Sequence, residues 1–130
     1  MNLVTPSLLI TDDDRDFRET LRQVFAPRGF RTLLAGDGEE ALDILHQETV
    51  HLLLLDMHMP KLSGLETIRE VRQQIGRLPW ILMSARMDEM VRSEAEQAQA
   101  SSVLAKPVSF SDLTGAVRRA LFEAYGWAER

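Results

Sequence analysis

The sequence predicts an α/β domain in which five parallel strands form one doubly wound sheet covered by five helices, a (βα)5 arrangement. Short apolar runs alternate with longer amphipathic stretches along the whole chain of 130 residues. The runs lack strict alternation of polar and apolar residues, which is typical of parallel strands buried on both faces. Hydrophobic residues make up 45% of the chain, enough for one sizeable core. We therefore expect a single domain over residues 1–130, with no output domain in this chain.

Five apolar runs are expected to form the strands, because each has the length of a strand and ends at polar or turn-forming residues. They are SLLIT (7–11), FRTLLA (30–35), VHLLLLD (50–56), PWILMS (79–84) and SSVLAK (101–106).

Four of the stretches that follow these runs repeat apolar residues at helical spacing and are predicted to be helices. The repeating residues are Phe17, Leu21, Val24 and Phe25; Ala41, Leu42 and Leu45; Leu65, Ile68, Val71 and Ile75; and Phe110, Leu113, Val117 and Leu121. SGLE (63–66) and SFSD (109–112) resemble capping boxes at two helix starts. A further helix over 88–100 has few large apolar groups and is expected to pack most loosely. Its apolar side is expected to hold Met90, Val91, Ala95 and Ala98.

Composition excludes several classes of function. The chain has no cysteine, so disulfides, thiolate metal sites and thiol redox chemistry are excluded. Its net charge of −5 argues against direct binding of nucleic acid, which needs a clustered basic face. No secretory signal and no run long enough to span a membrane is evident, so we expect a soluble, cytoplasmic protein.

Polar residues follow four of the expected strands. Asp12 and Asp13 end the first, Asp56 the third and Ser84 the fourth, while Lys106 ends the fifth. In an open α/β sheet, ligands bind outside the carboxyl ends of the strands, where these residues are expected to meet.

The residue types at this edge indicate a chemistry. Clustered carboxylates repel one another unless a cation joins them, and a set of oxygen ligands without histidine or cysteine suits Mg²⁺. Asp56 is then a candidate nucleophile toward phosphorus, forming an aspartyl phosphate, with Mg²⁺ and Lys106 neutralising the transferred group. The Ser84 hydroxyl would donate a hydrogen bond to a phosphoryl oxygen, and backbone N–H groups after Asp56 would donate further hydrogen bonds.

The segments LLITDDD, LLLLDMHMPKLSGLE, ILMSA and VLAKP, in this order, closely resemble the receiver domain of two-component response regulators. The resemblance spans nearly the whole chain and implies a flavodoxin-like fold. It implies that Asp56 takes a phosphoryl group from the phosphohistidine of a histidine kinase or phosphotransfer protein. Asp12 and Asp13 would organise Mg²⁺, with the backbone carbonyl of His58 as a further ligand. Lys106 would contact the phosphate and Ser84 would respond to it.

The resemblance also implies a switch that controls a downstream protein, catalysing only its own phosphorylation and dephosphorylation rather than acting as an enzyme on other substrates. Family members often pair through the face formed by the last two helices and the last strand, so a homodimer there is an expectation. At two positions the sequence departs from the usual pattern of the family, and both concern the switch and its control of a partner. Val103 stands where the family usually has an aromatic residue, and Gln99-Ala100 stands where a Gly-Ala pair is common.

Each feature also has a simpler interpretation. Taken alone, the acidic segment is more often a solvated helix start than a metal site, an interpretation we keep for Asp14 and Asp16. Ser84 and Lys106 taken singly are consistent with turn residues. The three histidines do not have the spacing of a helical metal pair and are treated as non-catalytic. The late aromatic residues Phe122, Tyr125 and Trp127 suit either terminal packing or a partner surface.

Three other functions compete with the leading one. An aspartyl phosphatase needs a second acid two residues after the nucleophile, where this chain has His58. A flavin carrier needs a phosphate-binding loop after the first strand, where three aspartates would repel an anion. A degenerate receiver would act as a phosphorylation-independent interaction module, which the intact acceptor, acids and lysine argue against.

Overall fold

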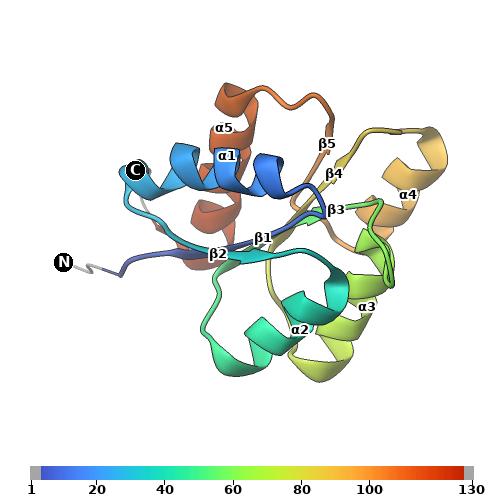
Figure 1. Ribbon diagram of the computed structural model, residues 1–130, viewed down its shortest axis with the longest axis horizontal. Helices are drawn as coiled ribbons and strands as arrows, with labels where there is room; N and C mark the ends of the chain where they lie inside the picture. The colour runs from blue at the N-terminus through green and yellow to red at the C-terminus, as the bar shows by residue number, and fades with distance from the viewer. Residues whose placement is uncertain (1–3, 128–130) are drawn as a thin grey trace.

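The computed structural model describes residues 4–127 and has one parallel sheet with the strand order β2-β1-β3-β4-β5 (Figure 1). The strands are β1 Ser7–Thr11, β2 Arg31–Ala35, β3 Leu52–Asp56, β4 Trp80–Ser84 and β5 Ser102–Ala105. All five strands lie inside the expected runs, and neighbouring strands in the sheet pair in parallel. The predicted doubly wound α/β fold is confirmed.

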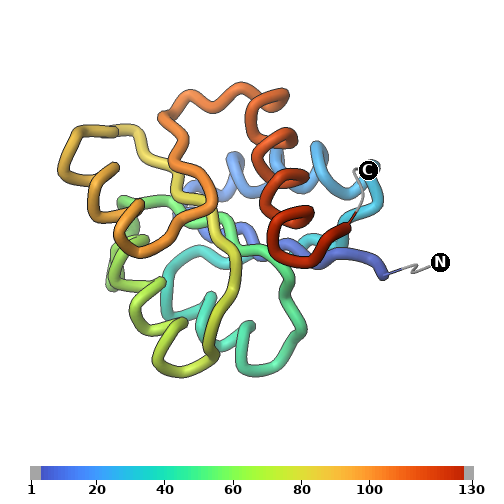
Figure 2. Tube along the Cα trace, turned by 180° about the vertical axis from the view of Figure 1, so that it is seen from behind, coloured from blue at the N-terminus to red at the C-terminus, as the bar shows by residue number. Residues whose placement is uncertain are grey.

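Within residues 4–127, four α-helices and one short 3₁₀ turn connect the strands, and a fifth α-helix follows β5. They are α1 Arg15–Phe25, the 3₁₀ turn Ala26–Arg28, α2 Gly38–Gln47, α3 Gly64–Gln74, α4 Glu89–Gln97 and α5 Phe110–Tyr125. In both views α1 and α5 lie on one side of the sheet, and α2 and α3 lie on the other (Figure 2). At the start of α3, Ser63 and Glu66 form both hydrogen bonds of the predicted capping box. At the start of α5, Ser109 Oγ accepts from the N–H of Asp112.

The sheet separates two apolar cores, because successive strand residues point to opposite faces. In β3, Leu53 and Leu55 join the core under α2, α3 and α4, whereas Leu52 and Leu54 join the core under α1 and α5. All four leucines are fully buried. The apolar run before Asp56 is therefore explained by a central strand covered on both faces.

Three expected core positions are wrong. Met90 is 70% exposed because Val91, Ala95 and Ala98 form the inner side of α4, and Met90 precedes that side by one residue. Phe110, the first residue of α5, is 44% exposed. Ile75 is 38% exposed because α3 ends at Gln74. Only Ala95 is buried among the residues of α4, which agrees with the expected loose packing.

The end of α5 and the residues that follow it pack near the start of β3, at the opposite edge of the sheet from the acidic residues. Tyr125 stacks on Trp127, and both rings contact His51 edge to face. The Tyr125 hydroxyl donates to the carbonyl of His51 at 2.7 Å. Terminal packing thus accounts for these two aromatic residues, while Phe122 is 59% exposed. Among the helices within residues 4–127, none has both the length and the apolar character needed to cross a bilayer.

Candidate functional site

The strand ends bring the predicted site residues to one edge of the sheet. Asp12 follows β1, Asp56 ends β3, Ser84 ends β4 and Lys106 follows β5. These four strands are consecutive neighbours in the sheet, so residues far apart in sequence are brought together. The rule that ligand sites form at the carboxyl ends of parallel strands is sufficient to predict this arrangement.

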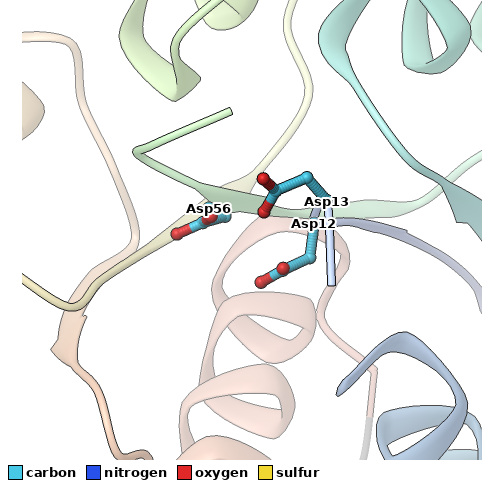
Figure 3. A group of neighbouring side chains, drawn as sticks. All are labelled: Asp12, Asp13 and Asp56. Atoms are coloured by element: carbon cyan, nitrogen blue, oxygen red, sulfur yellow. The ribbon is translucent and has the colours of Figure 1, made fainter. Parts of the chain in front are cut away.

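Three carboxylates form a cluster at this edge. One oxygen each from Asp12, Asp13 and Asp56 lies within 4.8 Å of the others, and the side chains are directed toward a common space (Figure 3). Asp12 and Asp56 are buried, whereas Asp13 is exposed. A set of oxygen ligands with one open side matches the way Mg²⁺ is held, by one or two carboxylates and several waters. These residues therefore fit a divalent cation.

Lys106 is the positive partner of the buried acids. Its Nζ donates to Asp12 Oδ2 at 2.6 Å and lies 3.4 Å from Asp56 Oδ1. The Lys106 side chain is 19% exposed, so these charges interact with little screening by water. A buried carboxylate without such a partner would be strongly destabilising.

The protonation equilibria of Asp56 and Lys106 reflect this crowding. Burial raises the pKa of the Asp56 carboxyl, as do the charges of Asp12 and Asp13, and Lys106 only partly offsets them. Burial lowers the pKa of the Lys106 ammonium, but its hydrogen bond and charge interaction with Asp12 outweigh this, with help from Asp56, and leave the pKa raised. The lysine is thus charged at neutral pH, while a nearby cation would favour the ionised form of Asp56.

The start of α1 fixes Asp12. Its Oδ1 accepts from the N–H of Asp14 at 2.9 Å, and its backbone carbonyl accepts from Arg18 Nη1 at 2.7 Å. Asp14 caps the helix by accepting from the N–H groups of Asp16 and Phe17. Asp14 and Asp16 therefore have the helix-start roles expected for them, and the acidic segment serves both the helix and the cluster.

Ser84 and His58 occupy the positions expected from sequence. Ser84 is fully buried, its Oγ accepts from the N–H of Arg86 at 3.1 Å, and its carbonyl accepts from the N–H of Lys106. His58 lies in the loop after β3 with an exposed side chain. The structure thus brings Asp12, Asp13, Asp56 and Lys106 into direct proximity, with Ser84 at the end of the adjoining strand.

Sequence analysis missed three residues that support the site. Gly64 lies so close to the end of β3 that a Cβ there would be 2.6 Å from the carbonyl oxygen of Asp56. The ring of Phe17, expected only as a core residue, lies 4.5 Å from Lys106 Nζ. Arg18 binds the backbone of Asp12. The position of Arg18, one helical turn after the acidic segment, is the signal in the sequence that could have indicated this contact. The contacts of Gly64 and Phe17 have no such signal, because they depend on the folded chain.

Chemically, the arrangement presents the Asp56 carboxylate beside the Lys106 ammonium, within a carboxylate cluster that fits a second cation. Such a pair of cations can neutralise an anionic phosphoryl group as it approaches Asp56. The residues match a model of a known family, the response regulator receiver domain, over residues 8–118.

The chain belongs to this family. Two-component signalling is therefore the context in which this receiver domain acts.

Two curated relatives are similar in sequence to this chain. The receiver is 37% identical to the transcriptional regulatory protein CpxR of Klebsiella pneumoniae, over 95% of this chain and 52% of CpxR. It is 37% identical to the response regulator MprA of Mycobacterium avium, over 88% of this chain and 50% of MprA. The chain spans about half the length of these relatives.

Solved structures agree in fold. The receiver domain of the Francisella response regulator 1452 superposes with a TM-score of 0.85 at 27% identity, covering 92% of this chain and 98% of that one. The response regulator TrrA of Thermotoga maritima, solved in complex with Mg²⁺-BeF, has a TM-score of 0.79 at 30% identity, covering 89% and 99% of the two chains.

Proposed function

We propose that Asp56 of this receiver accepts a phosphoryl group from the phosphohistidine of a histidine kinase or phosphotransfer protein, in a Mg²⁺-dependent reaction. The observation that carries the proposal is the position of the Asp56 carboxylate, which lies 3.4 Å from Lys106 Nζ and belongs to one cluster with the Asp12 and Asp13 carboxylates. The complex of TrrA with Mg²⁺-BeF supports the choice of metal, since that receiver is 30% identical.

In the proposed reaction, an Asp56 oxygen attacks phosphorus while the bond from phosphorus to the histidine nitrogen breaks, and that nitrogen keeps the electron pair. Lys106 neutralises one phosphoryl oxygen, and Ser84 would donate its hydroxyl to another. Asp12 and Asp13, with the backbone carbonyl of His58, would hold Mg²⁺. When bound, Mg²⁺ supplies the second positive charge that the transferring group needs.

The acyl phosphate would be removed by water, which attacks phosphorus and returns the Asp56 carboxylate and inorganic phosphate. The domain would thus catalyse only its own phosphorylation and dephosphorylation. Phosphorylation controls a partner if the acyl phosphate favours one conformer of the domain, because a ligand shifts an equilibrium only by its difference in affinity for the two states. The downstream partner would be a protein.

The test is the intact mass of the protein after incubation with Mg²⁺ and phosphoramidate. We expect one phosphoryl adduct that is lost in Asp56→Asn and after chelation of the metal. Asp43→Asn is the matched control, because Asp43 is an exposed carboxylate on α2, and it should keep the adduct. An adduct that persists in Asp56→Asn would refute the assignment of the acceptor. The absence of an adduct with both phosphoramidate and a cognate kinase would indicate a phosphorylation-independent interaction module.

A further inference from the structure

Lys106 has an aromatic neighbour in addition to its two acids. Its Nζ lies 4.5 Å from the centroid of the Phe17 ring, over the ring face. This distance is within the range of about 6 Å over which the negative face of an aromatic ring attracts a cation. The ammonium is therefore enclosed by Asp12, Asp56 and the Phe17 ring.

The first turn of α1 holds Phe17 in place. Its N–H donates to Asp14 Oδ1 at 3.2 Å, and the next residue, Arg18, is bound to the carbonyl of Asp12. The Phe17 side chain also packs against the core formed by α1, α5 and the sheet. The ring thus forms a fixed wall beside a long, flexible lysine side chain, which otherwise has many rotamers.

The two acidic neighbours of Lys106 belong to the cluster that fits a divalent cation. A cation bound there would share the oxygens of Asp12 and Asp56 with the ammonium, which weakens the hold of both acids on Lys106. The Phe17 ring is not a ligand for Mg²⁺, which prefers oxygen. Phe17 is therefore the one of these three neighbours whose attraction for Lys106 a metal does not reduce by direct competition.

We propose that Phe17 is a positioning residue: its ring holds the Lys106 ammonium beside Asp56 through a cation–π contact and thereby sets the rate at which Asp56 takes up a phosphoryl group. This inference rests on the proposed phosphoryl transfer. The competing explanation is that Phe17 only fills the core, in which case its aromatic character does not affect the chemistry.

Variants that separate ring character from core volume distinguish these explanations. Phe17→Leu keeps an apolar side chain but removes the ring, and Phe17→Tyr keeps the ring. Val24→Ala is the matched control, because Val24 is a partly buried residue of α1 that packs against the same core. We expect Phe17→Leu to slow adduct formation about 3- to 10-fold at saturating phosphoramidate and Mg²⁺. Phe17→Tyr should stay within about twofold of wild type, and Val24→Ala should leave the rate unchanged.

Two results of the rate experiment would overturn the proposal. One is an unchanged rate in Phe17→Leu. The other is an equal loss in Phe17→Leu and Phe17→Tyr, which would assign the effect to packing. Rates are compared per folded molecule, measured by circular dichroism, so a less stable variant remains informative. If the wild-type protein takes up no phosphoryl group from phosphoramidate or a kinase, the proposed function itself fails, and the rate-setting role of Phe17 fails with it.

A second readout does not depend on phosphorylation. Protons over the face of an aromatic ring resonate at lower chemical shift, so the ε-methylene protons of Lys106 should be shifted upfield in the metal-free wild-type protein. The shift should disappear in Phe17→Leu and persist in Phe17→Tyr. A normal Lys106 chemical shift in the wild-type protein would overturn the positioning role.

Discussion

Replacing Gly64 by alanine tests how tightly α3 is packed against Asp56. Gly64 is the first residue of α3, and a Cβ at this position would lie 2.6 Å from the carbonyl oxygen of Asp56 and 3.1 Å from the Cα of Met57. Both of these atoms are backbone atoms, so no side-chain rotation relieves the contact. An ordinary contact begins near 3.4 Å, so α3 and the end of β3 must separate by about 0.8 Å.

The cost of this separation can be estimated. Overpacking a well-packed site typically costs about 1–3 kcal/mol, and replacing a helical glycine by alanine returns about 0.5–1 kcal/mol. We therefore expect Gly64→Ala to lower the free energy of unfolding by about 1–2 kcal/mol. With a urea m-value of about 1–3 kcal/mol/M, the midpoint should fall by roughly 1 M. Because a displacement near 1 Å can cost about 100-fold in rate, phosphorylation should slow by about 10- to 100-fold.

Gly115→Ala is the matched control for Gly64→Ala. Gly115 lies within α5, and a Cβ there would meet no atom within 4 Å, so this variant should be stabilised by about 0.5–1 kcal/mol. The assay is urea unfolding followed by circular dichroism and by the fluorescence of Trp80, which is fully buried. If Gly64→Ala unfolds at the same urea concentration as wild type while Gly115→Ala is more stable, the argument from the Asp56 contact is wrong.

Three further predictions concern stability. Gln99 has a φ of 63°, so Gln99→Gly should raise the free energy of unfolding by up to about 1 kcal/mol in urea. Lys61 has a φ of 70°, but Lys61→Gly should raise it less because the variant loses two ion pairs. Equal gains in the two variants would contradict this reasoning. Mg²⁺ at ten times its dissociation constant should add about 1.4 kcal/mol to the free energy of unfolding in thermal melts. Asp13→Asn should lose most of that gain, and an undiminished gain would exclude Asp13 as a ligand. Burial lowers the pKa of His51 below its ordinary value of 6.5, so the unfolded chain binds more protons there and stability should fall as pH drops from about 6.5 toward the folded-state pKa. His51→Asn should flatten this part of the pH dependence of the urea midpoint, and an unchanged slope would show that other groups cause it.

Strand positions and the location of the site were predictable from sequence because both depend on local pattern. Apolar runs of strand length can form the centre of a parallel sheet, and residues that follow such runs must emerge at its carboxyl edge. This pattern alone is enough to place Asp56 and Lys106 at the same edge of the sheet, where the structure has them. Their chemical roles stay a prediction, as does the pairing of two copies through the last helices.

Contacts between side chains of different elements could not be predicted in this way. Helical periodicity correctly gave Phe17 an inward direction but could not show that its ring meets Lys106, because that contact depends on how α1 lies against β5. The exposure of Met90 could not be predicted either, because a helix with few large apolar residues gives a weak periodic signal. Gln99 stands where glycine is common in the family, and its left-handed backbone conformation is one that favours glycine.

The ion pair between Asp12 and Lys106 joins residues 94 positions apart, which directly follow β1 and β5. A chain emerging from the ribosome therefore has Asp12, Asp13 and Asp56 outside the exit tunnel well before Lys106. Until the fifth strand docks beside the fourth, the acids repel one another without their counter-charge, and the nascent domain lacks a competent site. Under the proposed function, phosphorylation would thus require completion of the sheet, so a truncated or half-synthesised receiver would not compete with finished molecules for phosphoryl groups.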